Sequence, residues 1–404
     1  LAGIALAAFP PARAQNSPGA AARQVVTRAD QLPRRTVRLE RLPSELLQAP
    51  LPELLVLADR VEADLRADLA QYDIQDMATL RGIESTLASL ALLRGRWQDL
   101  PGHAQRLREL TEKPSQRAST GVLLELLAEV NAAGTDEGAR ARQLTARVEQ
   151  RYGALDWADA QDSIKGLKAS METANPAVMV GALQSQLDTV ARNGDMVVPV
   201  GVLAGVLGAR AQLERILPLR QAIVAGLSPV VQRQMAAQPE RPDRWSGRTV
   251  DLAASERATP VTVAIWDSGV DMGLFKPAAA RGMAFDAQGH PVPDLLRPLG
   301  EAAARWPKLR DMAKGSMDLQ AGLDTEDARR FRALMAGLKP EDVKAFMEDA
   351  SLVSLYVHGT HVGGIAVDGN PFARVYPVSM HFGHTFPPPL PTAEGSQRVA
   401  ANYR

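Results

Sequence analysis

The sequence predicts an α/β fold that is preceded by a mostly α-helical N-terminal region. Within residues 44–237, apolar residues recur every three or four positions over long stretches, which is the period of an amphipathic helix. A charge-free and β-branched run at residues 261–266 is instead typical of a strand buried on both faces of a parallel sheet. The composition also favours helices, because Ala and Leu are abundant and aromatic residues amount to only 4%.

The bulk composition bounds the classes of protein that need to be considered. The 404 residues are enough for roughly two or three domains, and a hydrophobic content of 46% can fill real cores. The 46 basic and 46 acidic side chains cancel, so the net charge indicates neither a nucleic-acid partner nor an anionic membrane surface. The chain has no cysteine, which excludes disulfides, thiolate zinc sites and a cysteine nucleophile.

The first residues are typical of the remains of an export signal. Residues 1–9 form a short apolar run, and Ala12-Arg13-Ala14 follows as a small-x-small cleavage site. The run is too short to span a bilayer. We therefore expect a clipped signal peptide over residues 1–14 and export to the periplasm or the medium, with a random Ala-rich terminus as the alternative. Residues 15–43 are polar and have no apolar period, so we expect a linker there.

Residues 44–237 are expected to form the helical region. Two sets of apolar residues each align on one helix face, namely Leu54, Leu57, Val61, Leu65 and Leu69, and then Leu80, Ile83, Leu87 and Leu90. A third helix is expected from an N-cap at Ser119 or Thr120 to about Gly134, and a fourth from Thr135 onward. The apolar run at 197–207 is expected to be a buried segment and not a membrane span.

The role of this helical region is open at the level of sequence. It shows no convincing repeat and no cluster of catalytic residue types, so a solvated helical bundle is the plain interpretation. Our hypothesis for residues 44–237 is that they form a prodomain, a segment that assists the folding of the region after it or inhibits that region.

A change of composition at residues 238–254, rich in proline and charge, predicts a second linker before a domain at 255–404. Asp267 directly follows the strand expected at 261–266, and Ser268-Gly269 then forces a turn. Functional groups of open α/β sheets lie at the carboxyl ends of strands, and a carboxylate there can orient an imidazole. Taken alone, Asp267 is better explained as a turn residue that bonds nearby backbone amides.

The run His358 to Gly364 places two histidines and three glycines in seven positions. A histidine is suited to general-base work at neutral pH, because its ordinary pKa is near 6.5. The glycines allow a strand, a helix start or a substrate to approach closely. Two alternatives stay open, namely a metal site that uses His358 with His361 and a structural role for both histidines.

The sequence Asp-Ser-Gly-Val-Asp at 267–271 resembles the aspartate segment of the subtilisin-like serine peptidases (subtilases), and His-Gly-Thr-His-Val-Gly-Gly at 358–364 resembles their histidine segment. The resemblance implies an incomplete subtilisin-like parallel sheet flanked by helices, with protein or peptide substrates. It makes Asp267 the orienting carboxylate and His358 the general base, whereas His361 matches a non-catalytic histidine. Calcium is common in the family, but the resemblance identifies no ligand set here.

The two segments lie 358 − 267 = 91 residues apart, considerably more than in compact subtilisins. We expect the surplus, at about 289–352, to be a surface insertion with helices at 301–312 and 325–335 and a further helix start at Pro340. A place beside the substrate cleft is a further possibility for it. Residues 374–380 are expected to form a strand with Pro377 at a sheet edge. His381 and His384 could suggest a metal, although the proline-rich residues beside them favour a loop.

The family's serine lies in a Gly-Thr-Ser-x-Ala segment, and nothing in the 404 residues matches it. We therefore expect the nucleophile beyond residue 404, and we expect the chain alone to be inactive, with an unpaired sheet edge and a half-covered apolar face. The alternative is a truncated or degenerate, non-catalytic subtilase that acts as a binding or inhibitory module. A metal-binding protein that uses His358 and His361 is the third interpretation. Cleavage specificity and oligomeric state stay open.

Overall fold

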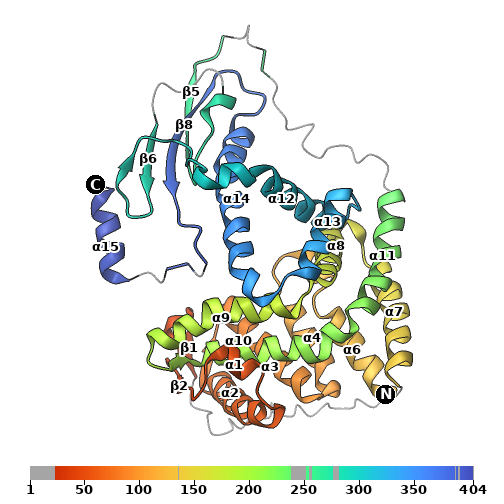
Figure 1. Ribbon diagram of the computed structural model, residues 1–404. Coiled ribbons are helices and arrows are strands. Elements are labelled where there is room, and N and C mark those ends of the chain that lie inside the picture. The colour runs from red at the N-terminus through yellow and green to blue at the C-terminus, as the bar shows by residue number, and fades with distance from the viewer. Residues whose placement is uncertain are drawn as a thin grey trace, which may run out of the picture.

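The computed structural model describes residues 23–134, 136–237, 252–253, 257–275, 282–386, 388–389 and 392–403. The chain is an α/β protein with a helical N-terminal region, shown low in Figure 1, and a small sheet above it. The long helix α14 runs from the sheet down to the helical region. The predicted signal at 1–14 lies outside the described residues, and so does nearly all of the predicted linker at 238–254.

Helices dominate residues 43–237, as predicted. They are α1 (Pro43–Leu47), α2 (Leu51–Gln71), α3 (Met77–Arg94), α4 (Leu100–Glu109), α5 (Pro114–Arg117), α6 (Val122–Ala132), α7 (Glu137–Gly153), α8 (Trp157–Thr173), α9 (Pro176–Asn193), α10 (Val200–Ala211) and α11 (Arg220–Ala237). The faces expected for the first two helices point into the core, where Leu54, Val61 and Leu90 are fully buried. One large hydrophobic core joins most of these helices.

The ends of two predicted helices shift by a few residues. Helix α6 follows Gly121, which has a φ of 81°, and not Ser119 or Thr120. Helix α7 uses Asp136 as its N-cap, because the Asp136 carboxylate accepts a hydrogen bond from the backbone N–H of Ala139 at 2.9 Å. Thr135, the residue expected to start this helix, lies outside the described residues.

The linker predicted at 15–43 is wrong for its described part. Strand β1 (Gln24–Val26) pairs in parallel with β3 (Tyr72–Ile74), and β2 (Thr36–Arg38) pairs antiparallel with β4 (Val197–Pro199). The side chains of Val26 and Val37 are buried. Three-residue strands are too short for an alternating pattern to stand out from a polar stretch, so these strands could not be predicted. The apolar run at 197–207 is buried as expected, as β4 and the first half of α10.

The second region is built on a four-stranded sheet of order β5-β8-β6-β7, formed by β5 (Val261–Asp267), β8 (Ala373–His381), β6 (Met283–Asp286) and β7 (Pro291–Val292). Strand β8 pairs in parallel with both β5 and β6. The prediction that β5 is buried on both faces is wrong, because β5 is an edge strand of the described sheet. Val261 is 53% exposed and Trp266 is 74% exposed. On the inner side, Ile265 forms a small core with Val270 and Val375, and the partly buried Val263 packs against it.

Pro377 was expected at a sheet edge, and this prediction is also wrong, because β8 is a central strand. Pairing between β6 and β8 begins at Met283 opposite Val378, one residue past the proline. At Pro377 itself, only β5 is paired, through Ile265. A proline without an N–H is tolerated at this point because the second neighbouring strand has not yet begun.

The predicted insertion at 289–352 is helical, but it is not a surface appendage. The helix predicted at 301–312 is shifted, because residues 300–305 form a 3₁₀ turn and α12 spans Trp306–Gln320. Helix α13 (Glu326–Gly337) lies close to the predicted 325–335, with Thr325 as its N-cap. Helix α14 (Pro340–Val367) starts at the predicted proline and continues without a break through residues 358–364. The insertion and the histidine segment therefore share one helix of 28 residues.

The insertion docks on the helical region. The side-chain amide of Asn175 donates to the carbonyl oxygens of Met335 at 2.7 Å and Leu338 at 2.9 Å, which holds the turn between α13 and α14. Gly181 of α9 lies so close to the buried Val343 of α14 that an added Cβ would be 2.7 Å from the Val343 Cβ. Helix α14 thus joins two regions that the sequence suggested were separate (Figure 1).

Two further details complete the fold. Helix α15 (Ala393–Asn402) lies beside β6, where Tyr403 packs edge-on against Phe285 with ring centroids 5.0 Å apart. The short elements are 3₁₀ turns at Ala29–Gln31, Trp97–Asp99, Leu217–Leu219 and Met272–Leu274 and a π turn at Gln212–Ile216.

Candidate active site

Asp267 is the last residue of β5, opposite Ser379 of β8, so its side chain lies at the carboxyl end of the parallel pair as predicted. The backbone N–H and the hydroxyl of Ser268 donate to the Asp267 Oδ1 atom at 2.7 and 3.0 Å. The Asp267 side chain is only 15% exposed. The turn that follows Asp267 therefore holds its carboxylate in place independently of His358.

His358 reaches Asp267 from helix α14. The His358 Nδ1 atom lies 2.7 Å from the Asp267 Oδ1 atom, although 91 residues separate the two in the chain. An ionised carboxylate can only accept, so the proton of this bond sits on Nδ1. In the neutral ring, Nε2 then carries the free lone pair, as general-base work requires. The His358 side chain is 60% exposed, so a reactant can reach the ring.

The electrostatics of the pair favour an ionised Asp267. Burial opposes its charge, but hydrogen bonds from His358 and from Ser268 outweigh that effect and leave the pKa of Asp267 below its ordinary value. The carboxylate therefore stays negative over the pH range in which a histidine titrates. A negative Asp267 can both orient the ring and stabilise its protonated form.

Gly359 explains how α14 comes so close to the aspartate turn. A Cβ at Gly359 would lie 2.3 Å from the Gly269 carbonyl oxygen and 3.0 Å from the Asp267 Cβ, distances that no side chain can occupy. The adjacent Thr360 ties the same turn, because its hydroxyl accepts a hydrogen bond from the Asp271 backbone N–H at 2.9 Å. The histidine segment thus holds the aspartate turn through its backbone as well as through His358.

The other two glycines of the segment differ from each other. Gly363 is buried, and a Cβ there would meet the Phe275 ring at 3.1 Å. Gly364 has no atom within 4 Å of the position of a Cβ. Close approach, one of the uses expected for these glycines, is confirmed for Gly359 and Gly363 and not for Gly364.

A hollow of about 400 Å³ lies beside the pair, and it is lined by Trp266, Asp267, Ser268, Ser354, Leu355, His358, Met380 and Phe382. Helix α14 forms one wall of it. The predicted insertion ends at residue 352, so its last turn leads directly into this wall. The insertion borders the site through the helix that it shares with His358.

Three serines lie near the hollow or the strands that form it. Ser268 holds Asp267, and the fully buried Ser379 donates to the Leu295 carbonyl oxygen at 2.6 Å. Ser354 lies on the hollow's wall and is exposed. Within the described part of the chain, no hydroxyl forms a hydrogen bond with the His358 ring. The described residues therefore supply the Asp–His pair without a nucleophile.

The remaining histidines give no metal site among the described residues, where no group of three or more His, Asp or Glu side chains is placed to hold an ion. His361 is exposed on α14. His381 ends β8 and His384 lies in the loop after it; Arg297 donates to the His381 carbonyl oxygen and to the His384 Nδ1 atom, both at 3.0 Å. Burial, together with the Arg297 charge, lowers the pKa of His381.

Sequence reasoning found Asp267 and His358, but it missed the residues that hold them. Neither the Ser268 hydroxyl nor Thr360 was singled out. In the sequence, only their positions inside the two segments could have identified them. Ser268 directly follows Asp267, and Thr360 stands two residues after His358.

Comparisons with protein-family models, curated proteins and solved structures find no match to this chain. Among the described helices, none combines the length and the apolar character that a membrane crossing needs. The α/β class with a helical N-terminal region is what the structure establishes.

Proposed function

We propose that this chain carries the Asp–His part of the active site of an exported subtilisin-like serine endopeptidase. The observation that supports this best is the 2.7 Å contact between His358 Nδ1 and Asp267 Oδ1. Two segments chosen by their resemblance to the family's aspartate and histidine segments meet in the arrangement that the chemistry requires. The proposal also accounts for Gly359 and Thr360, which are needed only if α14 must lie against the aspartate turn.

In the proposed mechanism, Asp267 holds the His358 ring with its Nδ1 proton toward the carboxylate. His358 Nε2 takes the proton of a serine hydroxyl as the oxygen attacks the peptide carbonyl carbon, and later returns that proton to the leaving amine. Asp267 stays ionised and stabilises the imidazolium between these steps. The serine would come from a segment outside the 404 residues.

The edge of the sheet fits a larger catalytic domain. Within the described strands, β5 is paired along one edge, and its Trp266 and Val261 side chains, which point to opposite faces of the sheet, are mostly exposed. An open edge with exposed apolar side chains is unfavourable for a protein in water. We propose that a further strand of the complete peptidase pairs with β5 and covers these residues.

The helical region is proposed to assist folding of the peptidase and not to block its active site. Its contacts go to α12, α13 and the first half of α14, for example through Ala169, which packs in one cluster with Leu319 and Ala328, and through Asn175 and Gly181. None of the residues that line the hollow beside His358 belongs to the helical region. Because the helical region docks on the first half of α14 and not at the hollow, it is better placed to assist folding than to inhibit the active site.

A non-catalytic binding or inhibitory module is the second candidate. The observation in its favour is that no described hydroxyl is bonded to His358. In this case the Asp267–His358 contact would be structural, and the helical region would provide the binding surface.

The two candidates can be separated by expressing the chain together with the coding sequence that follows Arg404, beside the 404-residue chain. We expect the longer protein to cleave casein and to be labelled by a fluorophosphonate, and the 404-residue chain to do neither. In the longer protein, Asp267→Asn should lower kcat by about 10⁴-fold, and His358→Ala by at least as much.

The matched control is His361→Ala, which removes an exposed histidine one helical turn away and should leave the activity within about twofold. A stop codon after Arg404, or casein cleavage that survives His358→Ala, would overturn the peptidase proposal. The first result would favour the non-catalytic module. The second would require a different catalytic centre.

A further inference from the structure

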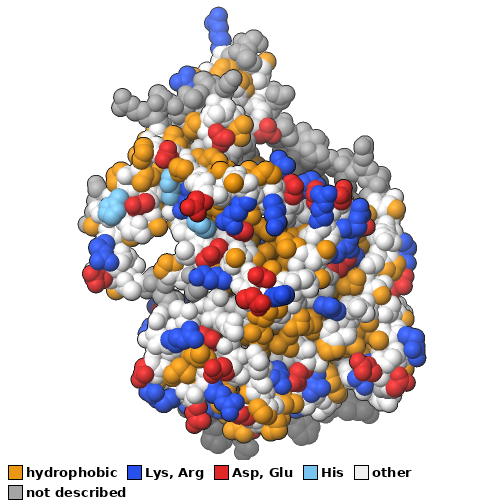
Figure 2. Space-filling model, in the orientation of Figure 1, with side chains coloured by type: hydrophobic (Ala, Val, Ile, Leu, Met, Phe, Trp, Pro, Cys, Tyr) orange, Lys and Arg blue, Asp and Glu red, His pale blue; other side chains and the backbone are white. Residues whose placement is uncertain are grey.

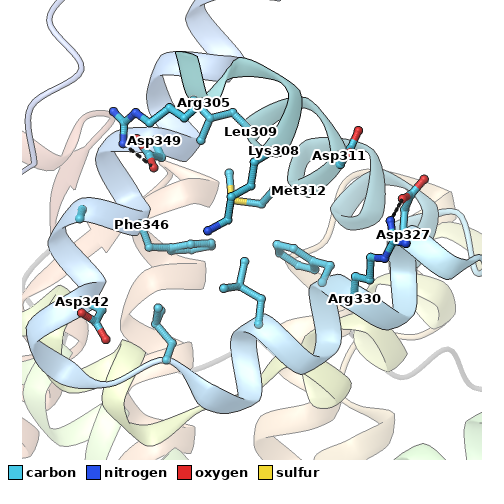
Figure 3. A pocket seen from close by; sticks show the side chains of 14 residues that line it. Arg305, Lys308, Leu309, Asp311, Met312, Asp327, Arg330, Asp342, Phe346 and Asp349 are labelled. Carbon is cyan, nitrogen blue, oxygen red and sulfur yellow. Dashed lines mark hydrogen bonds and ion pairs between the residues drawn. The ribbon is translucent and has the colours of Figure 1, made fainter. Parts of the chain in front are cut away.

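A second hollow lies among α12, α13 and α14, away from the Asp–His pair. It has a volume of about 630 Å³, within the usual range for small-molecule sites. Figure 3 shows side chains of all three helices around it. In Figure 2, hydrophobic side chains gather over these helices with basic and acidic side chains around them.

The floor of the hollow is apolar. It is formed by Leu309, Met312, Phe331, Leu334, Leu338 and Phe346. Leu309 and Leu338 are buried, and the rings of Phe331 and Phe346 are tilted by 37° to each other with centroids 6.4 Å apart. A floor of this kind favours the hydrocarbon part of a ligand, because every apolar atom placed there leaves water.

The charged side chains of the rim are mostly neutralised by one another. Arg305 pairs with Asp349 at 2.8 Å, and Arg330 pairs with Glu326 and, more loosely, with Asp327. These ion pairs offset much of the charge of Arg305 and Arg330. Both therefore attract a negatively charged ligand less strongly than an unpaired cation does.

The lining of the hollow also contains the acidic side chains of Asp311 and Asp342. Asp311 contacts the neighbouring Arg310 at 3.2 Å, and in Figure 3 its carboxylate points away from the hollow. Asp342 lies in the first turn of α14, where a carboxylate stabilises the helix dipole. Neither carboxylate is aimed at the apolar floor.

Lys308 is the exception among the basic residues of the lining. Within the described part of the chain, its amine has no hydrogen bond or ion pair. Figure 3 shows the side chain reaching into the hollow toward Phe346. An unpaired ammonium group above an apolar floor is complementary to a single negative charge at the end of a hydrocarbon.

We infer that the hollow binds a small amphipathic carboxylate, with its alkyl chain on the apolar floor and its carboxylate at Lys308. A chain of about ten carbons is a suitable length for a site of this volume. The ligand is a free acid and not a protein segment, because the site is a concave pocket with a single anchoring charge.

The site faces away from the Asp–His pair. Asp349 of the rim precedes His358 by nine residues. At about 100° per residue, this spacing is two and a half helical turns, so the two residues lie on opposite faces of α14. The same spacing places the two residues about 13 Å apart along the helix axis. A ligand in the hollow would therefore not be positioned for the Asp–His pair, and the inference does not depend on the proposed peptidase function.

The test is a calorimetric titration of the purified 404-residue chain with decanoate below its micellar concentration. We expect saturable binding of one decanoate per chain and clearly weaker binding of decylamine, which has the same alkyl chain and the opposite charge. Lys308→Gln should raise the Kd for decanoate by about fivefold, the effect of one partly exposed ion pair. Ala345→Trp, which fills the hollow from α14, should remove binding altogether.

The matched control is Lys344→Gln, which removes one positive charge from α14, outside the lining of the hollow, and should leave the Kd unchanged. If Lys308→Gln and Lys344→Gln have the same effect, or if decylamine binds as tightly as decanoate, the inference is wrong. If only a peptide with a hydrophobic C-terminal residue binds, the occupant is a polypeptide and the inference is again wrong. Circular dichroism checks the fold of Ala345→Trp, and the two lysine variants decide the question if that protein is unfolded.

Discussion

The helical region and the sheet region are stabilised to very different degrees by their own residues. The helical region has one continuous core that includes fully buried side chains such as Leu54, Leu90 and Leu203. The sheet region has a small core around Ile265 and Val375, and its outer strand β5 is largely exposed. The first region can bury enough apolar surface to be stable alone, whereas the second depends on what packs against it.

Helix α14 is where this dependence is visible. Its first half packs against α9 of the helical region through the buried Val343, and its second half carries His358 to the sheet. The weaker region is therefore held in place by a helix whose other end is anchored in the stronger one. A substitution along this connection should therefore lower the free energy of unfolding by an amount that increases with the buried surface it disrupts.

The largest effect is expected from core truncation in the helical region. Leu90→Ala should lower the free energy of unfolding by about 4 kcal/mol, because Leu90 is fully buried in an extensive core that cannot collapse around a cavity. Leu352→Ala, in a smaller cluster on α14, should cost only about 2 kcal/mol. Urea unfolding of both variants measures the difference, and equal losses would contradict the comparison.

The second effect concerns the contact between α14 and the aspartate turn. Gly359→Ala places a methyl group against the Gly269 carbonyl oxygen and should destabilise the sheet region by about 1–3 kcal/mol while separating His358 from Asp267. Gly364→Ala is the control on the same helix, where the added methyl group has open space and should stabilise by about 0.5–1 kcal/mol. Thermal unfolding of both variants tests the pair, and two similar melting temperatures would count against the tight contact.

The third effect concerns the junction between the two regions. Asn175→Ser keeps an oxygen that can cap α9 but removes the amide that bonds Met335 and Leu338. The loss should be about 1–2 kcal/mol and should appear as faster hydrogen exchange at the start of α14. Asn131→Ala is the control, because the Asn131 amide bonds only within its own helix. Unchanged exchange at residues 338–343 in Asn175→Ser would show that the junction does not rely on this amide.

The smallest effect is electrostatic. The pKa of Asp267 is below its ordinary value in the folded chain, so its contribution to stability is present above about pH 4, the unfolded value, and is lost as the pH falls through the folded pKa. His358→Ala removes the hydrogen bond that lowers this pKa and should raise it. Carbon-13 NMR titration of the Asp267 carboxyl group measures the change, with His361→Ala as the control. No rise in His358→Ala would mean that Ser268 alone sets the pKa.

The helices were predictable from the sequence because their signals are local. The apolar period of α2 and α3, the cap at Thr325 and the proline at the start of α14 all lie within a few residues of the elements they specify. The exposure of β5 was not predictable, because it depends on which strands lie beside it. The central place of Pro377 has the same origin, since it is set by where the neighbouring strand β6 begins.

The two reactive side chains of the candidate site could be predicted from the sequence, but the residues that hold them in place could not. Asp267 and His358 stand in segments of unusual composition, so they could be chosen without a structure. The sequence does not show how the 91 residues between them fold to bring the two together. In the structure, this segment includes α12, α13 and the first half of α14. The docking of that path on Asn175 and Gly181 leaves no periodic or compositional trace in the sequence.

The uninterrupted course of α14 has a consequence for the order in which the molecule can assemble on the ribosome. Residues 23–237 leave the exit tunnel before any part of α14 is synthesised, and their core is complete without it. When Pro340 emerges, every residue of that core has been synthesised, so the surface on which the first turns of α14 dock can form without the helix. Each further turn then extends from an anchored nucleus, so the costly first step of helix formation is avoided for the turns that carry His358. A histidine late in a long chain is thereby positioned by residues that folded well before it.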